Sequence, residues 1–447
     1  MMGLGFAEIL VLAIMSGGIS NTDLVTLVQP GHYFKSRQID ISVDKAIAYA
    51  GDEAKTAKQQ IVQLTALRYL MEESETLKKS PKYAAQRQVL EQIASGKKAN
   101  DSQGFAQEYA AALLAKLDDT KAADVKYPPL RADILNWFPA DVALAMAVDF
   151  RQTRKAGTND TLKNLLKLMP EHGKQEMYDH IEKSGNIRVE RIAFAMVPSE
   201  KREEQKMYLR FTGKGNHAWV VDLIKMMDKN RGRLEIESLK DEKDTPITLV
   251  KEKFSPMIAI VGNTDVVVAG FDRPQGKDRD VFDALMDVRA KKKANAFTGV
   301  LKARLAKVPD KAIAFIVGDA PEFLKRELRL SGFEPVPTNI TAWAERAQQG
   351  MDVQVETSTA NGDDANKLVR KVGDLRKQGI DQLKQLMQQG LPPDAPPIPF
   401  PAIINLLETL QVQSDRDRVN VRLFVPDGLA DRLLNGWILF AGARELK

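Results

Sequence analysis

The chain has 447 residues, of which 44% are hydrophobic and 28% charged, a composition typical of globular proteins. That length exceeds one ordinary core and favours about two to four domains. Lys and Arg total 65 against 60 Asp and Glu, and the resulting net charge of +5 gives no footprint of nucleic-acid binding. The absence of cysteine excludes disulfides, thiol nucleophiles and thiolate metal sites.

The N-terminus contains an apolar segment over residues 4–15 that is broken by Glu8. It is shorter than the roughly 20 residues that span a bilayer, and it matches the apolar region of a signal peptide. Gly18 and Ser20 suit cleavage before Asn21, although no Lys or Arg precedes the apolar run. We expect residues 1–20 to be a signal peptide. The alternatives are a retained membrane anchor, with residues 4–15 contacting the membrane, and a buried helix.

A helical pattern follows, and we assign residues 21–125 to a helical domain. Ser42, two residues before Asp44, predicts a helix start. Apolar residues then recur at spacings of three and four, which indicates one face of an amphipathic helix: Ile61, Leu64, Leu67, Leu70 and Met71. The stretch "QEYAAALLAKL" (107–117) resembles the second helix of HEAT-type repeats. This resemblance implies stacked helical hairpins, which serve either as a cap or as a partner-binding groove.

Prolines at 128 and 129 place a boundary near residue 125, and short strand-like runs between helices follow. We assign residues 126–300 to a first α+β module, in which Gly262 and Asn263 supply a hairpin turn. The predicted strands are 141–150, 188–198, 206–213, 247–253 and 257–271. The predicted helices are 158–169 and 216–227.

Residues 301–447 repeat this order and form a second module. Its predicted strands are 311–319, two within 340–359 and a hairpin over 410–426. Its predicted helices are 321–330, 361–387 with a cap near Asp363, and 427–436. A proline-rich linker over 391–401 separates the long helix from the hairpin.

Two pairs of stretches suggest that the modules arose by internal duplication. "FPADVALAMAVDF" (138–150) and "VPDKAIAFIVGDAP" (308–321) share an early proline and aspartate, an apolar run and a closing aspartate. "RFTGKGNHAWVVDLI" from Arg210 matches "ETSTANGDDANKLVRKV" from Glu356. We therefore predict an α+β fold. It has a helical N-terminal domain and two related modules of mostly antiparallel sheet with helices on one face.

The whole pattern resembles uncharacterised exported proteins of planctomycete-type bacteria. The resemblance rests on the short apolar N-terminus, the helical region and the repeated modules of proline, aspartate, apolar strand, turn and helix. It spans most of the chain and implies an extracytoplasmic address, with no known activity.

The sequence shows no catalytic constellation, and we predict no catalytic, cofactor-binding or metal-ligating residue. None of the histidines, His32, His172, His180 and His217, belongs to a metal-binding motif, and His172 and His180 are the closest pair. The glycines at 213 and 215 indicate a turn, because the phosphate-loop pattern is absent. The acidic stretches 360–366 and 414–418 indicate a helix cap and a hairpin turn rather than calcium sites.

Two further groups of residues are candidates for a binding surface. The basic run 289–295 is interpreted as a helix end, with an anionic polymer or headgroup as the alternative. The tryptophans are predicted to pack in cores, since a sugar-binding platform would need several of them exposed on one face: Trp137, Trp219, Trp343 and Trp437.

The sequence therefore predicts a non-enzymatic exported or cell-envelope protein that acts in binding or scaffolding through repeated modules. Its partner would be a protein or an envelope polymer, and not nucleic acid. Two alternatives stay open. One is a hydrolase or small-ligand-binding protein with a site in the cleft between the modules. The other is a membrane-anchored assembly subunit.

Overall fold

The computed structural model describes most of the chain, and all statements below concern that part. It covers residues 28–97, 104–120, 129–131, 135–153, 170–199, 201, 204–228, 234–252, 256–271, 278–320, 322–330, 334–389, 399–426 and 429. Several predictions lie outside these residues: the segment 1–20, the helix over 158–169, most of the linker 391–401, nearly all of the helix over 427–436, and Trp437.

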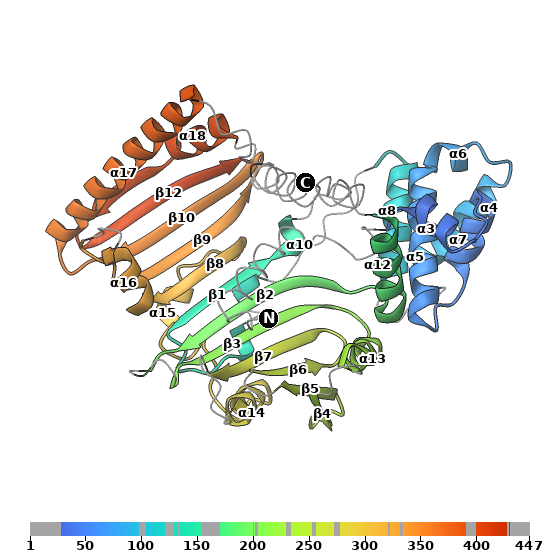
Figure 1. Ribbon diagram of the computed structural model, residues 1–447, viewed down its shortest axis with the longest axis horizontal. Coiled ribbons are helices and arrows are strands. Elements are labelled where there is room, and N and C mark those ends of the chain that lie inside the picture. The colour runs from blue at the N-terminus through green and yellow to red at the C-terminus, as the bar shows by residue number, and fades with distance from the viewer. Residues whose placement is uncertain are drawn as a thin grey trace.

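The N-terminal helices pack into one helical body, coloured blue in Figure 1. The Ser42 side chain accepts the backbone N–H of Lys45, as expected for the predicted helix start. Thr56 and Gln59 form a capping box at the next helix. The apolar spacing predicts the buried face correctly, with Ile61, Leu64, Leu67 and Leu70 all fully buried. The helices are α3 (Pro30–Ser36), α4 (Val43–Gly51), α5 (Ala57–Glu72), α6 (Ser74–Lys78), α7 (Tyr83–Ala94) and α8 (Phe105–Leu117).

Helix α12 (Glu171–Ser184) follows the first strand in sequence but packs into the helical body. Tyr178 of α12 is 1% exposed within that core. Glu182 accepts hydrogen bonds from the Tyr33 hydroxyl at 2.7 Å and from Arg37 Nε at 2.9 Å. A segment predicted to belong to the first module therefore completes the helical body.

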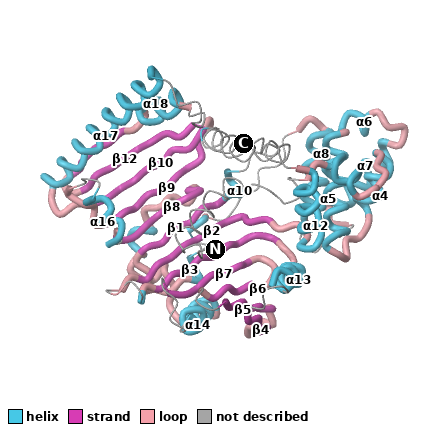
Figure 2. Tube along the Cα trace, in the orientation of Figure 1, coloured by secondary structure: helices cyan, strands magenta, loops and turns pink. Residues whose placement is uncertain are grey.

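The described strands form one twelve-stranded sheet in which all neighbours are antiparallel, as Figure 2 shows in magenta. Its order is β11-β12-β10-β9-β8-β1-β2-β3-β7-β6-β5-β4. The first-module strands are β1 (Leu144–Asp149), β2 (Arg188–Val197), β3 (Lys206–Lys214), β4 (Leu234–Lys240), β5 (Pro246–Glu252), β6 (Met257–Val261) and β7 (Asp265–Phe271). The second-module strands are β8 (Ala312–Asp319), β9 (Asn339–Ala347), β10 (Gly350–Ser358), β11 (Gln411–Asp415) and β12 (Arg418–Pro426).

The two modules repeat the same strand order on either side of the β1–β8 pair. Starting from the pair Met146–Ile316, the order β1-β2-β3-β7-β6 matches β8-β9-β10-β12-β11. The residue pairings between corresponding strands of the two modules also agree. Arg210 and Glu356 therefore occupy equivalent positions, as the sequence comparison predicts. This confirms two related modules. The modules meet as hydrogen-bonded neighbouring strands of a shared sheet.

The remaining helices lie around this sheet. In the first module they are η1 (Leu135–Trp137), α10 (Phe150–Thr153), α13 (His217–Asp228) and α14 (Asp278–Arg289). In the second they are α15 (Lys302–Leu305), α16 (Glu322–Leu330), α17 (Gly362–Gln389) and α18 (Phe400–Glu408). None of the helices in the described ranges is both long enough and apolar enough to cross a bilayer.

The two sides of the sheet differ between the modules. We call face A the side that carries Ala195 and Trp343, and face B the side that carries Phe194 and Val355. In the first module, face A is buried beneath α14, η1 and the segment 296–308 in the largest apolar core. In the second module, α17 packs on face B through Leu368.

Three local features sharpen the sequence predictions. Gly262 has a φ of 58° in the β6–β7 turn, where a hairpin turn was predicted. Asn361 rather than Asp363 caps α17, because its Oδ1 accepts the Asp364 backbone N–H at 2.9 Å. Strand β4, an edge strand of alternating half-buried and exposed residues, was not predicted.

The junction between the modules yields a stability prediction at Gly318, whose φ is 154°. A Cβ there would lie 2.2 Å from the Ala143 carbonyl oxygen on the neighbouring strand. We expect Gly318→Ala to destabilise the protein by about 1–3 kcal/mol in urea unfolding. The control is Gly373→Ala in α17, where a Cβ meets nothing within 4 Å. It should stabilise the helix by about 0.5–1 kcal/mol. Equal effects of the two substitutions would contradict the strand packing described here.

Candidate functional site

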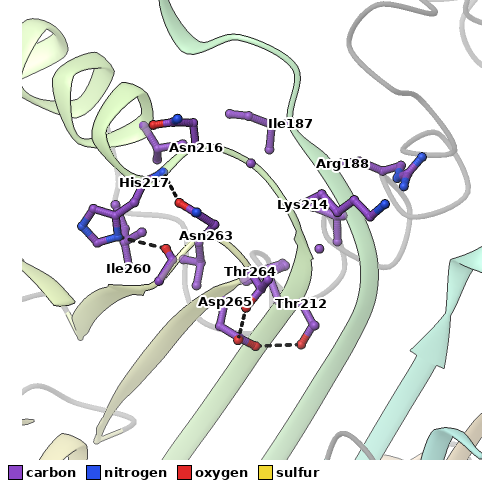
Figure 3. A pocket seen from close by; sticks show the side chains of 17 residues that line it. Ile187, Arg188, Thr212, Lys214, Asn216, His217, Ile260, Asn263, Thr264 and Asp265 are labelled. Atoms are coloured by element: carbon purple, nitrogen blue, oxygen red, sulfur yellow. Dashed lines mark hydrogen bonds between the residues drawn. The ribbon is translucent and has the colours of Figure 1, made fainter. Parts of the chain in front are cut away.

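The first candidate is a small cavity where β3 leads into α13, shown in Figure 3. Its volume is about 60 Å³, and it is lined by the adjoining ends of β2, β3, β6 and β7 together with the first turn of α13. A space of this size holds a few water molecules at most.

The polar groups around this cavity are already engaged with one another. The Asn216 Oδ1 accepts the backbone N–H of Trp219, and Asn263 accepts that of His217 at 2.9 Å. The His217 ring lies between the Gly262 carbonyl and the Thr248 hydroxyl, both at 2.9 Å. Because a carbonyl only accepts, Nδ1 donates to Gly262, while the Thr248 hydroxyl, which can donate or accept, contacts Nε2. His217 therefore positions the start of α13 and is not free for proton transfer.

Asp265 anchors the deeper wall of the same cavity. Its carboxylate accepts bonds from Arg210 Nε at 2.8 Å, the Thr212 hydroxyl at 3.0 Å and the Thr264 hydroxyl at 2.7 Å. The Arg210 guanidinium also lies 3.8 Å from the ring centroid of Trp137, which is buried as predicted. Burial lowers the pKa of Arg210, and the neighbouring Asp265 opposes that shift. This satisfied cluster is structural.

The other sequence candidates do not converge on a site. His172 and His180 are both exposed on α12, and the described residues contain no group of three or more potential metal ligands. The backbone N–H groups of Gly213 and Gly215 donate to the carbonyls of residues 264 and 263, as befits a turn. The basic run at 289–295 starts at the end of α14 and pairs with acidic neighbours: Arg289 with Asp241, Lys292 with Glu242, and Lys293 with Asp287.

The second candidate is an open pocket on face A of the second module. Its volume is about 270 Å³. The residues that line it come from four adjacent strands and are mainly polar: Trp343 of β9; Gln354, Val355 and Glu356 of β10; Gln411 and Gln413 of β11; Asn420, Val421 and Arg422 of β12. Val355 and Val421 belong to face B, and the register places the other side chains in two rows across the strands of face A. One row is Trp343, Gln354, Arg422 and Gln411, and the next holds Glu356, Asn420 and Gln413.

The polar groups of this pocket divide into two kinds. The charged ones are paired: Arg422 with Asp352 at 2.7 Å, and Glu356 with Lys307. Among the uncharged ones, the amides are open to a ligand, whereas the indole N–H of Trp343 is buried from solvent. Within the described part of the chain, the indole N–H of Trp343 is buried and has no hydrogen-bond partner. No side-chain hydrogen bond engages the four amides there, which are Gln354, Gln411, Gln413 and Asn420.

The equivalent positions of the first module have the opposite character. The shared register equates Trp343 with Ala195 and Gln354 with Tyr208. It likewise equates Gln411, Gln413, Asn420 and Arg422 with Met257, Ala259, Val267 and Ala269. All of these first-module residues are buried in the core beneath α14. Apart from Arg210, the buried equivalent of Glu356, the same backbone thus carries an apolar, covered surface in one module and a polar, open surface in the other.

This pocket was not predicted from the sequence. Alternation along 411–422 did show one polar side, because Gln411, Gln413, Asn420 and Arg422 alternate with Val412, Val419 and Val421. Trp343 was predicted to pack in a core, and it is half-buried at the margin of the largest core. What the sequence did not reveal was the pairing of β12 with β10, which brings the amides beside Trp343.

Comparison with known proteins does not identify a family for this chain. No protein-family model matches the chain, and no curated protein matches it. Among solved structures, crystal form I of TP0453 aligns with a TM-score of 0.32 and 10% identity over 69% of this chain and 97% of that one. Crystal form III aligns at 0.31 and 11% identity, covering 71% and 100% of the two chains. TM-scores this low do not establish a shared fold or function.

The structural role of the first cavity leads to a prediction at Asp265. Replacing one partner of a buried ion pair leaves the other charge uncompensated, so Asp265→Asn should destabilise the protein by about 3–5 kcal/mol. The matched control is Asp283→Asn, which removes an exposed i,i+4 pair with Arg279. It should change stability by less than about 1 kcal/mol. Urea unfolding monitored by circular dichroism compares the two. Similar small losses would contradict the structural role of Asp265.

Proposed function

We propose that this protein is an exported or cell-envelope binding protein that holds its ligand against face A of the second module. The observation that carries the proposal is the contrast between the modules. Apart from Arg210, the equivalent of Glu356, the positions are apolar and covered in the first, and in the second they form an open pocket of amides without side-chain partners among the described residues, beside a half-buried tryptophan. The extracytoplasmic address rests on the predicted signal segment 1–20.

Two further observations support binding over catalysis. The modules join through hydrogen-bonded strands β1 and β8, so their junction is a packed strand pair of the kind expected for a scaffold. The histidines of the described residues have structural partners or lie exposed and apart. Of the buried aspartates there, Asp149 and Asp265 are paired with arginines, and Asp278 accepts the backbone N–H of Phe271. The carboxylate that lines the pocket, Glu356, is paired with Lys307, so the amides and the tryptophan supply recognition.

The test uses the absence of cysteine in the natural chain. A single cysteine is introduced by Gln413→Cys inside the pocket, and separately by Lys243→Cys in the exposed β4–β5 turn as a control. Each variant is labelled with a membrane-impermeant maleimide, both in intact producing cells and as purified protein. We expect the control cysteine to be labelled equally fast in both settings, and the pocket cysteine to be labelled at least fivefold more slowly in cells.

The two comparisons separate the two parts of the proposal. If the reagent fails to label the control cysteine in intact cells, the extracytoplasmic address is wrong. If it labels both cysteines in cells as fast as in the purified protein, face A of the second module is not occupied there, and its role in binding is wrong.

A further inference from the structure

We infer that the ligand of this pocket is a neutral saccharide, an assignment that rests on the function proposed above. The hydrogen-bonding groups, the charge, the placement on the sheet and the dimensions of the pocket all favour this ligand class.

The hydrogen-bonding groups match hydroxyl groups. A primary amide offers two donor hydrogens and one acceptor oxygen, and a sugar hydroxyl both donates and accepts. Gln354, Gln411, Gln413 and Asn420 therefore present four such bifunctional groups on one surface. The indole N–H of Trp343 is buried from solvent, so the four amides carry the hydrogen bonding to a ligand.

The charge of the pocket favours an uncharged ligand. Arg422 and Glu356 are its only ionised lining residues in the described part of the chain, and each has an opposite charge beside it in Asp352 and Lys307. The four charges cancel, so neither an anionic nor a cationic ligand gains from the net field. Trp343 supplies the aromatic surface on which the apolar C–H side of a sugar ring can pack.

The placement of the pocket argues against a bound peptide strand. Extended peptides bind a sheet by adding to its edge, where backbone N–H and C=O groups are free. Here the unpaired groups are side chains on the face of β9, β10, β12 and β11. The backbones of β9, β10 and β12 are paired on both sides, and among these four strands only the outer side of β11 is an edge of the described sheet. Asn420, moreover, lies within β12 although asparagine is disfavoured in strands, so strand formation does not explain its presence.

The dimensions suit a short stretch of a sugar chain. The cavity of about 270 Å³ is near the lower limit for small-ligand pockets, which are roughly 300–1,000 Å³. The row from Trp343 to Gln411 crosses four strands. At a strand spacing of about 4.8 Å it extends for about 14 Å.

The test is titration calorimetry on the purified chain with three neutral hexasaccharides: maltohexaose, cellohexaose and chitohexaose. We expect at least one to bind, with a change in tryptophan fluorescence that is lost in Trp343→Phe. The double substitution Gln411→Ala and Gln413→Ala should weaken that binding at least tenfold. The control pair Gln385→Ala and Gln388→Ala removes two exposed amides from α17 and should leave it unchanged. Circular dichroism confirms that each variant is folded.

Three results would overturn the inference. The first is no binding of any of the three saccharides. The second is binding that survives loss of the pocket amides, and the third is a preference for polygalacturonate or for a polar peptide. If the cysteine in the pocket is nonetheless protected in cells, the proposed binding function is supported and only the saccharide assignment is wrong. If that cysteine is freely labelled, the binding function and the saccharide assignment are both wrong.

Discussion

The antiparallel pairing of β1 with β8 is the contact on which the rest of this architecture depends. It joins residues far apart in the sequence, from Leu144 with Gly318 to Val148 with Ala314. Without it the modules would be two separate, smaller sheets. With it the apolar core of face A runs continuously across the junction, where Ala145 and Ala147 of β1 lie in the same core as Phe315 and Val317 of β8. The small alanines leave room for the segments that cover this face.

The shared backbone does not fix the chemistry of its surface. Both modules have the same strand order and register, yet beyond β8 the second module lacks the cover that α14 and the segment 296–308 give to face A of the first. An apolar side chain is stable in such a strand only when it is covered, since each buried methylene contributes about 0.8 kcal/mol. Polar side chains at the open positions therefore follow from exposure. Exposure alone would equally accept lysine, glutamate or threonine. The concentration of amides around a half-buried tryptophan is what points to recognition.

Much of this fold could be predicted from local patterns. Periods of three to four residues identified the buried face of α5, and apolar runs located β1 and β8 with their shared closing aspartate. The match of Arg210 with Glu356 even gave the correct register between modules. The packing between segments that are distant in sequence could not be predicted from such patterns. Nothing local indicates that α12 leaves its own module to pack against Tyr33, or that β12 pairs with β10 rather than with β9. The pocket was missed for this reason, because its rows cross strands that are distant in sequence.

Hydrogen–deuterium exchange of the backbone amides tests the central claim most directly, because protection reports the stability of each hydrogen-bonded element. A single continuous sheet predicts that amides of β1 and β8 exchange among the slowest in the protein and at similar rates. The edge strands β4 and β11 should exchange much faster. If β1 and β8 instead exchange as fast as those edges, or at clearly different rates from each other, the modules are not joined through this strand pair.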